Sequence, residues 1–172
     1  MMKKWQRFLG RLLVFFSFFS VISLIVYLNV AQTSEKTLEG QKMPDIKSEA
    51  WNQTEIHWTA KDGRAKLIYF YEPQCTYCLE QLELLHQYER KGAFKEVDVV
   101  AVTTEQKKEL HRLYNTKGWY IRTVIDDGTW EKTFRPKQIP TLVIINEQGK
   151  IIRYIEKQIH AENLDLILKS IS

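Results

Sequence analysis

Residues 66–78 read K-L-I-Y-F-Y-E-P-Q-C-T-Y-C, and this stretch decides the fold. The expected strand is Lys66–Tyr71. Apart from Lys66, its residues are apolar or aromatic, as in a strand that is buried on both faces. Two cysteines, Cys75 and Cys78, follow where the strand gives way to a helix that is expected to run to about Lys91. Unpaired backbone N–H groups and the helix dipole at such a terminus stabilise a thiolate. The arrangement predicts Cys75 as an exposed nucleophile with a lowered thiol pKa, and Cys78 as a more buried resolving thiol.

The C-x-x-C spacing has two other interpretations. Structural zinc requires four ligands, but the sequence has no second cysteine pair, and its four histidines are scattered singly (His57, His86, His111 and His160). An inert disulfide across four residues closes too short a loop to add much stability. A redox-active disulfide is therefore the favoured interpretation. The pair itself is then the reactive centre, and neither a separate cofactor nor a metal is expected.

Strands and helices alternate along the rest of the domain. The expected strands are Ile56–Trp58, Val97–Thr103, Ile121–Ile125, Leu142–Asn146 and Ile151–Ile155. The turn residues Glu147–Lys150 join the last two strands as a hairpin. A capping box at Thr103-x-x-Gln106 predicts a helix that ends near Lys117, and apolar residues at helical spacing predict a last helix around Leu164–Ile171. This order implies an α/β fold in which a mixed central sheet is flanked by helices on both faces.

Charge is unevenly distributed along the 172 residues. The chain has 25 basic and 21 acidic side chains, and four of the basic ones fall within residues 1–11, ahead of the first acidic residue, Glu35. The other 21 basic residues balance the 21 acidic ones, so the formal net charge of +4 belongs to the N-terminal tail. A basic surface on the domain is not supported, and nucleic acid is not expected as a partner.

The segment behind that tail is long and apolar. Residues 12–30 carry no charge, and about 20 mainly apolar residues suffice for a helix to cross the hydrocarbon core. The basic tail places the N-terminus in the cytoplasm. A cleaved signal peptide is the alternative, but its apolar core usually spans about 7–15 residues and ends in small residues, whereas Asn29-Val30-Ala31 is a poor cleavage site. A buried helix of a soluble core would show a polar face, which this segment lacks.

The predicted organisation has four parts. They are a cytoplasmic basic tail (1–11), a transmembrane signal-anchor helix (12–30), a linker (31–39) and an extracytoplasmic domain (40–172). About 130 residues are enough to build one hydrophobic core. The chain is therefore expected to be a single-pass protein of the cell membrane, attached through residues 12–30.

A proline stands directly before the apolar strand that begins at Leu142. Because proline cannot donate a hydrogen bond to a central ladder, Ile139-Pro140-Thr141 marks either a special backbone conformation or a simple proline between loop and strand. This motif is the last of an ordered set along residues 40–171. The earlier motifs are Gly40-x-x-Met43-Pro44-Asp45, Leu67–Tyr71 leading into Cys75-x-x-Cys78, Thr103-Thr104, and Asp126-Asp127-Gly128.

The ordered set resembles the thioredoxin superfamily, and within it the membrane-anchored TlpA/ResA-like thiol–disulfide oxidoreductases of bacteria. The resemblance implies a thioredoxin-like fold with an N-terminal strand extension and a central helix–strand insertion. It implies that Cys75 and Cys78 are the catalytic pair. It also implies that Ile139–Pro140 is a cis peptide packed against that pair, where the backbone of a substrate docks.

The sequence departs from the family around the cysteine pair. Gln74 stands where tryptophan is common, Tyr69 where thioredoxins have a buried acid, Gln81 where this group has a glutamate, and Thr76-Tyr77 where reducing members have Gly-Pro or Glu-Pro. The proton-transfer groups of the family therefore do not carry over by position. Glu72 and Glu80 are candidates for proton transfer, with solvated carboxylates as the alternative. Tyr77, together with Ile139, Pro140 and Thr141, is a candidate for substrate binding.

The sequence thus favours an extracytoplasmic, membrane-tethered oxidoreductase that exchanges disulfides with protein substrates. A membrane redox partner is expected to reset the pair after each turnover. The Thr-Tyr dipeptide leaves the direction of exchange open, because potentials in such folds span about −270 to −120 mV. A copper-binding assembly protein on the same fold is the alternative, and it requires a histidine such as His111 or His160 beside the cysteines. A peroxidase would need a threonine before its reactive cysteine, which Glu72-Pro73-Gln74 does not supply.

Overall fold

The computed structural model describes residues 19–24 and 38–171, and the chain divides into two units, residues 1–37 and 38–172. Residues 19–24 are helical. Within the described residues, no helix is both long and apolar enough to cross a membrane. Most of the predicted anchor, and all of the predicted basic tail, lie outside the described residues.

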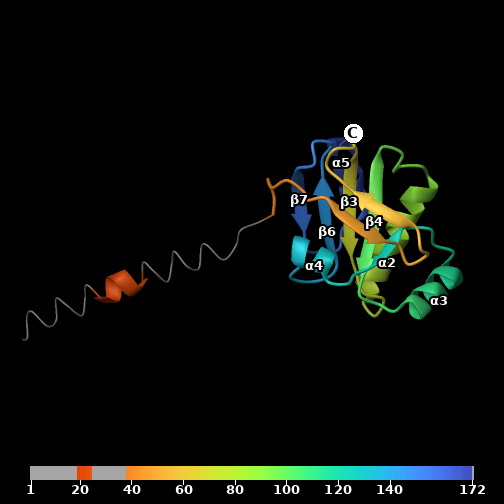
Figure 1. The fold of residues 1–172 in the computed structure, drawn as a ribbon, viewed down its shortest axis with the longest axis horizontal. Helices are drawn as coiled ribbons and strands as arrows, with labels where there is room; N and C mark the ends of the chain where they lie inside the picture. The colour runs from red at the N-terminus through yellow and green to blue at the C-terminus, as the bar shows by residue number, and fades with distance from the viewer. Residues whose placement is uncertain (1–18, 25–37, 172) are drawn as a thin grey trace, which may run out of the picture. The chain divides into compact units, whose positions relative to one another are not determined.

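A five-stranded mixed sheet forms the centre of residues 38–171, with the strand order β5-β4-β3-β6-β7 (Figure 1). The strands are β3 (Ala65–Phe70), β4 (Val97–Thr103), β5 (Thr123–Ile125), β6 (Thr141–Ile145) and β7 (Ile151–Ile155). The pairs β3–β4 and β4–β5 are parallel, whereas β3–β6 and β6–β7 are antiparallel. All six residues of β3 are buried, as the apolar run predicts for a central strand.

Alternate residues of β3 enter two separate cores, because neighbouring side chains of a strand point to opposite faces. Leu67 and Tyr69 pack with α2 (Thr76–Arg90), α3 (Lys107–Lys117) and α5 (Ala161–Ile171). Ile68 and Phe70 pack with α4 (Thr129–Phe134) and with the hairpin of β1 (Ile46–Glu49) and β2 (Glu55–Trp58). The predicted α/β fold with helices on both faces of a mixed sheet is confirmed.

The two additions implied by the resemblance are both present. The antiparallel hairpin β1–β2 precedes the sheet and is its N-terminal strand extension. The unit α3–β5 lies between β4 and α4 and is the helix–strand insertion. Neither β1 nor the six-residue α4 is predicted by hydrophobic periodicity, because both are too short to show a period.

The predicted capping box is wrong. Thr103 is the last residue of β4, and α3 begins at Lys107 with Gln106 as an N-cap that makes no side-chain cap hydrogen bond. The hydroxyl of Thr103 instead accepts the N–H of Glu105 at 3.2 Å and donates to a carboxylate near the cysteines. A local motif was outweighed here by a contact between residues far apart in the sequence.

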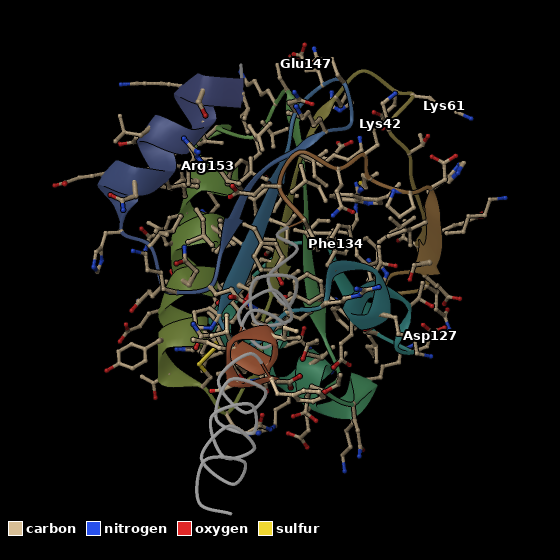
Figure 2. The ribbon with its side chains drawn as sticks, turned by 90° about the vertical axis from the view of Figure 1, so that its left-hand side faces the viewer. Lys42, Lys61, Asp127, Phe134, Glu147 and Arg153 are labelled. Carbon is tan, nitrogen blue, oxygen red and sulfur yellow. A yellow bond between two sulfur atoms is a disulfide. The ribbon has the colours of Figure 1, made fainter. Side chains whose placement is uncertain are left out.

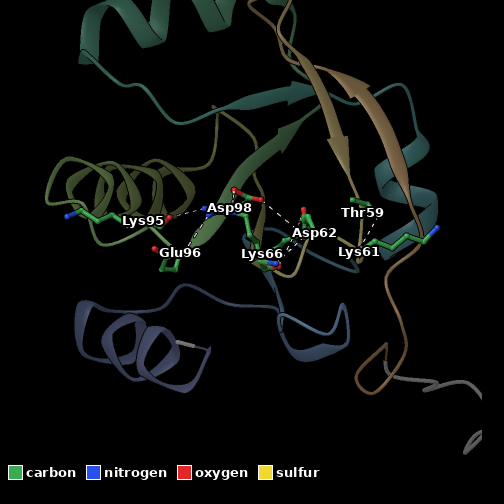
Figure 3. Close-up of polar contacts among 8 residues, drawn as sticks. Thr59, Lys61, Asp62, Lys66, Lys95, Glu96 and Asp98 are labelled. Atoms are coloured by element: carbon green, nitrogen blue, oxygen red, sulfur yellow. Dashed lines mark hydrogen bonds and ion pairs between the residues drawn. The ribbon is translucent and has the colours of Figure 1, made fainter.

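A buried lysine, Lys66, lies near the start of β3, at the other end of the strand from the exit toward the cysteines, and Figure 3 shows its polar contacts. The side chain of Lys66 is 1% exposed, and its Nζ lies 2.6 Å from Asp62 Oδ2 and 3.6 Å from Asp98 Oδ2. It also lies over the ring of Trp58, 5.7 Å from the centroid. Burial of Asp62 raises the pKa of its carboxyl, but the hydrogen bonds from Lys66 and from the backbone N–H of Arg64 outweigh burial and lower it.

Replacing Lys66 by alanine should destabilise the domain by about 3 kcal/mol near pH 7, because it leaves Asp62 and Asp98 without their shared buried cation. Urea unfolding followed by fluorescence measures this loss. A carboxyl with a lowered folded-state pKa contributes stability above its unfolded pKa of about 3.9, and loses it as the pH falls through the folded value. The difference in the free energy of unfolding between wild type and Lys66→Ala should therefore become smaller below about pH 4.

The matched control is Lys61→Ala, because Lys61 is 85% exposed and lies 3.8 Å from Asp45. Exposed pairs of this kind contribute about 0–1 kcal/mol. If Lys66→Ala were as stable as Lys61→Ala, the buried contacts of Lys66 with Asp62 and Asp98 would not stabilise the domain as proposed.

Candidate active site

The two cysteines form a disulfide at the first turn of α2, with their Cα atoms 5.1 Å apart. Figure 2 shows it as the yellow bond at one end of that helix. Cys75 is the N-cap of α2, has an extended backbone, and accepts the N–H of Cys78 on its Sγ at 3.2 Å. Cys75 is half-buried, whereas Cys78 is completely buried. The predicted position at a helix N-terminus and the predicted difference in burial are both confirmed.

The sheet register brings two loops to the same edge: the cysteine loop (residues 71–75, between β3 and α2) and the proline loop (residues 135–140, between α4 and β6). Phe70, the last residue of β3, pairs with Thr141, the first residue of β6. The chain therefore leaves β3 toward Cys75 at the edge where the loop ending in Pro140 enters the sheet. The Ile139–Pro140 peptide bond is cis, as the resemblance implies.

The candidate substrate-binding residues differ in exposure. Tyr77 and Ile139 present large apolar side chains to solvent, with exposed fractions of 64% and 40%. Thr141 is completely buried, and its hydroxyl donates to the carbonyl of Gln138 at 2.5 Å. The side chain of Thr141 therefore braces the proline loop, while Tyr77 and Ile139 provide exposed apolar surface.

A buried tyrosine lies beneath the pair. Tyr69 comes from β3 and donates its hydroxyl to the carbonyl oxygen of Cys78 at 2.8 Å. Its ring stacks on Tyr71, with centroids 5.7 Å apart and planes 5° from parallel. Burial raises the pKa of Tyr69 well above its ordinary value, so the side chain stays neutral. At the position of the family's buried acid, this chain therefore has a neutral hydrogen-bond donor.

A chain of buried hydroxyls connects Tyr71 to the insertion α3–β5. The hydroxyls of Tyr71 and Tyr114 lie 3.4 Å apart, and that of Tyr114 is in turn bonded to Thr123. Thr123 donates to the carbonyl of Ile121 at 3.1 Å. Burial raises the pKa of both Tyr71 and Tyr114. This chain of hydroxyls links Tyr71, directly after β3, to α3 and β5, and so fixes the insertion to the segment that leads into the site.

Glu72 is held in place by three hydrogen bonds to its carboxylate. The donors are the hydroxyl of Thr103 at 3.2 Å, and the backbone N–H and hydroxyl of Thr104 at 3.1 and 2.7 Å. The backbone carbonyl of Glu72 also accepts the N–H of Cys75 at 3.1 Å. Glu72 thus ties the cysteine loop to the end of β4, and it lines an open pocket of about 400 Å³ together with Ile139.

Three further polar side chains that are close to the pair in sequence have fixed partners. Glu80 is exposed and accepts from Gln158 Nε2 at 2.9 Å. Gln81 is completely buried, and its Oε1 accepts the backbone N–H of Ile159 at 2.7 Å. Gln74 donates to Glu105 at 2.6 Å. The sequence marks Gln74 and Gln81 only as departures from a family pattern, and their partners lie too far along the chain to be predicted.

The copper alternative requires a histidine at the cysteine pair. Among the described residues, no group of three or more His, Cys, Asp or Glu side chains is placed to hold a metal ion. The ring of His111 lies near Trp51 and within 3.2 Å of Asn115. His160 is exposed just before α5.

Residues 38–167 match the Redoxin family, and the chain belongs to it. With its mixed sheet and its C-x-x-C disulfide at a helix N-terminus, the protein is a protein-disulfide oxidoreductase of the thioredoxin superfamily, in the TlpA/ResA-like group. Its sequence is similar to the thiol-disulfide oxidoreductase ResA of Bacillus cereus, at 22% identity over 175 residues that cover 99% of each chain.

Solved structures share the fold. The thiol:disulfide interchange protein of Chlorobium tepidum superposes with a TM-score of 0.70 at 16% identity, over 77% of this chain and 97% of that chain. StoA of Bacillus subtilis superposes with a TM-score of 0.65 at 19% identity, over 72% of this chain and 96% of that chain. At these identities the structures support the fold alone.

Replacing Tyr69 by phenylalanine should lower the free energy of unfolding by about 1 kcal/mol, because the buried carbonyl of Cys78 loses a hydrogen bond. Denaturant unfolding of the oxidised protein measures the change. Tyr120→Phe is the matched control and should have little effect, since Tyr120 is 80% exposed. Equal stability of the two variants would show that the Tyr69 hydroxyl does not support the cysteine helix.

Proposed function

We propose that this protein is tethered to the membrane and exchanges disulfides with protein substrates outside the cytoplasm. Cys75 is the attacking thiol and Cys78 the resolving thiol. The observation that carries this assignment is the N-cap position of Cys75, which is half-buried and accepts an N–H at 3.2 Å, beside the fully buried Cys78. A sulfur at a helix N-terminus gains most from the dipole and the unpaired N–H groups when it becomes an anion.

The exchange proceeds through a mixed disulfide. In the reducing direction, the Cys75 thiolate attacks one sulfur of a substrate disulfide, and the other substrate sulfur leaves as a thiolate. The Cys78 thiolate then attacks Cys75, which releases the second substrate thiolate and leaves the Cys75–Cys78 disulfide. The reverse sequence oxidises a substrate dithiol. The pair itself is the redox centre, and a membrane redox partner resets it.

Substrate contacts are assigned to the exposed apolar surface at this edge of the sheet. Tyr77 extends from the first turn of α2, and Ile139 precedes the cis peptide, so both flank the cysteine loop. Proton exchange is assigned to Glu80 rather than to Glu72. The Glu72 carboxylate is occupied by three hydrogen bonds, whereas Glu80 is exposed and has a single amide partner.

Membrane attachment is supported by the N-terminal sequence. Residues 1–11 hold the whole net positive charge, and residues 12–30 are uncharged. A basic flank before a single apolar segment favours a cytoplasmic N-terminus. The similarity to ResA of Bacillus cereus extends over 99% of this chain, and so includes this segment.

Both parts of the proposal are tested by expressing the full chain with Cys78→Ser in bacterial cells. Without the resolving thiol, mixed disulfides on Cys75 should accumulate, and should disappear on treatment with dithiothreitol. A membrane-impermeant maleimide added to intact cells should label the free Cys75 thiol. Non-reducing gels and mass spectrometry of the tagged chain measure both outcomes.

Two variants serve as controls. Cys75→Ser should trap few partners, because Cys78 is completely buried. A chain with both cysteines replaced and Lys3→Cys added should be labelled only after the cells are lysed. Adducts that form mainly on Cys78 would reverse the assigned roles, and labelling of Cys75 only after lysis would contradict the extracytoplasmic placement.

A further inference from the structure

Gln81 carries an unsatisfied buried hydrogen-bond donor one helical turn after Cys78. Within the part of the chain that the structure describes, two buried side-chain nitrogens have no hydrogen-bond partner, Gln81 Nε2 and Trp130 Nε1. The second belongs to the core on the other face of the sheet, whereas Gln81 lies on the same helix as the disulfide. Leaving a buried donor unpaired costs free energy, so it calls for an explanation.

The orientation of the Gln81 amide is fixed by its other end. Its Oε1 accepts the backbone N–H of Ile159 at 2.7 Å. A backbone N–H only donates, so the atom facing Ile159 must be the amide oxygen. The NH₂ group therefore points away from Ile159 and cannot exchange places with the oxygen without losing that bond.

The position of Gln81 on α2 places its side chain on the side of the helix that carries Cys78. Residues three apart lie on the same side of a helix, and Cys78 and Gln81 are both 0% exposed. Helical side chains lean toward the N-terminus, so that of Gln81 covers the preceding turn, which holds Cys78. When the disulfide opens, the sulfur of Cys78 becomes a charged acceptor on this same side of the helix.

We propose that Gln81 Nε2 donates a hydrogen bond to the Cys78 sulfur when that sulfur is a thiolate, which makes Gln81 a catalytic residue of the exchange. The inference rests on the proposed function and deepens it. A substrate thiolate attacks Cys75, a new S–S bond joins the two, the Cys75–Cys78 bond breaks, and its electron pair leaves on Cys78. The substrate sulfur is oxidised and Cys78 is reduced, so the step needs no proton.

The other groups around Cys78 make this donor important. The titratable neighbours are Cys75 and, from β3, Tyr69, whose hydroxyl is already committed to the carbonyl of Cys78 at 2.8 Å. Glu80, two residues along α2, is exposed and bonded to Gln158. A buried thiolate without a donor is strongly disfavoured. The Gln81 amide supplies a donor without adding a negative charge that would repel the sulfur.

Two properties of the protein should follow from this bond. A leaving thiol of lower pKa departs faster, so Gln81 should speed the opening of the disulfide at Cys75. The donor is unpaired in the disulfide form and paired in the opened form, so it should also favour the opened form. Gln81 therefore shifts the pair toward accepting electrons.

The test uses the full-length chain in detergent, with Gln81→Glu and Gln81→Met. Gln81→Glu keeps an acceptor for the Ile159 N–H but replaces the donor with a carboxylate, and Gln81→Met removes both. Each change should raise the pKa of Cys78, measured by thiolate absorbance in a Cys75→Ser background, by about one unit. Each should also slow the opening of the wild-type disulfide by dithiothreitol several-fold.

The matched control is Gln87→Met, because Gln87 is exposed on the same helix and bonded to Glu83. It should leave both quantities unchanged. If Gln81 merely anchored Ile159, the uncharged Gln81→Met variant would keep the wild-type pKa of Cys78 and the wild-type rate of disulfide opening, and that result would overturn the inference. A wild-type disulfide that dithiothreitol opens but that never exchanges with a protein disulfide would instead refute the proposed function.

Discussion

The complete burial of β3 on both faces is the constraint on which the rest of the structure depends. Its alternate side chains fill two cores, so the strand cannot slip by one residue without exchanging them. The chain must therefore leave the sheet at Phe70, beside the start of β6. That register sets where α2 begins. It also brings the cysteine loop and the proline loop to one edge of the sheet, so the pairing of β3 with β6 places the two loops together whether or not the disulfide is formed.

The buried side of the site is made of neutral groups. Tyr69 and Gln81 occupy the two positions where the family has acids, and each has a fixed orientation set by a hydrogen bond. Among the described residues around the pair, Glu72 is half-buried and bonded to Thr103 and Thr104, and Glu80 is exposed. In the proposed role of Gln81, the buried Cys78 thiolate is stabilised by an amide donor, and the effect of that donor is large because the surroundings screen little. In this arrangement, a buried carboxylate does not compete with the thiols for protons.

The sequence predicts the part of the site that depends on local pattern. The buried strand, the following helix and the C-x-x-C pair at their junction all show in residues 66–78. The resemblance adds the cis peptide. The rest depends on contacts across the fold: Glu72 contacts Thr103, the last residue of β4, and the following Thr104, and Gln81 contacts Ile159. The capping box fails for the same reason, because Thr103 is drawn into the strand and toward Glu72.

The central claim is that Cys75 and Cys78 form a redox couple that cycles. Equilibrating the full-length protein in glutathione buffers of stepped ratio, followed by quenching and counting of free thiols, measures it most directly. The account predicts one reversible two-electron transition, at a potential within the range of about −270 to −120 mV spanned by proteins of this fold. A pair that stays oxidised or stays reduced across that range, or that never re-forms its disulfide, would contradict the account.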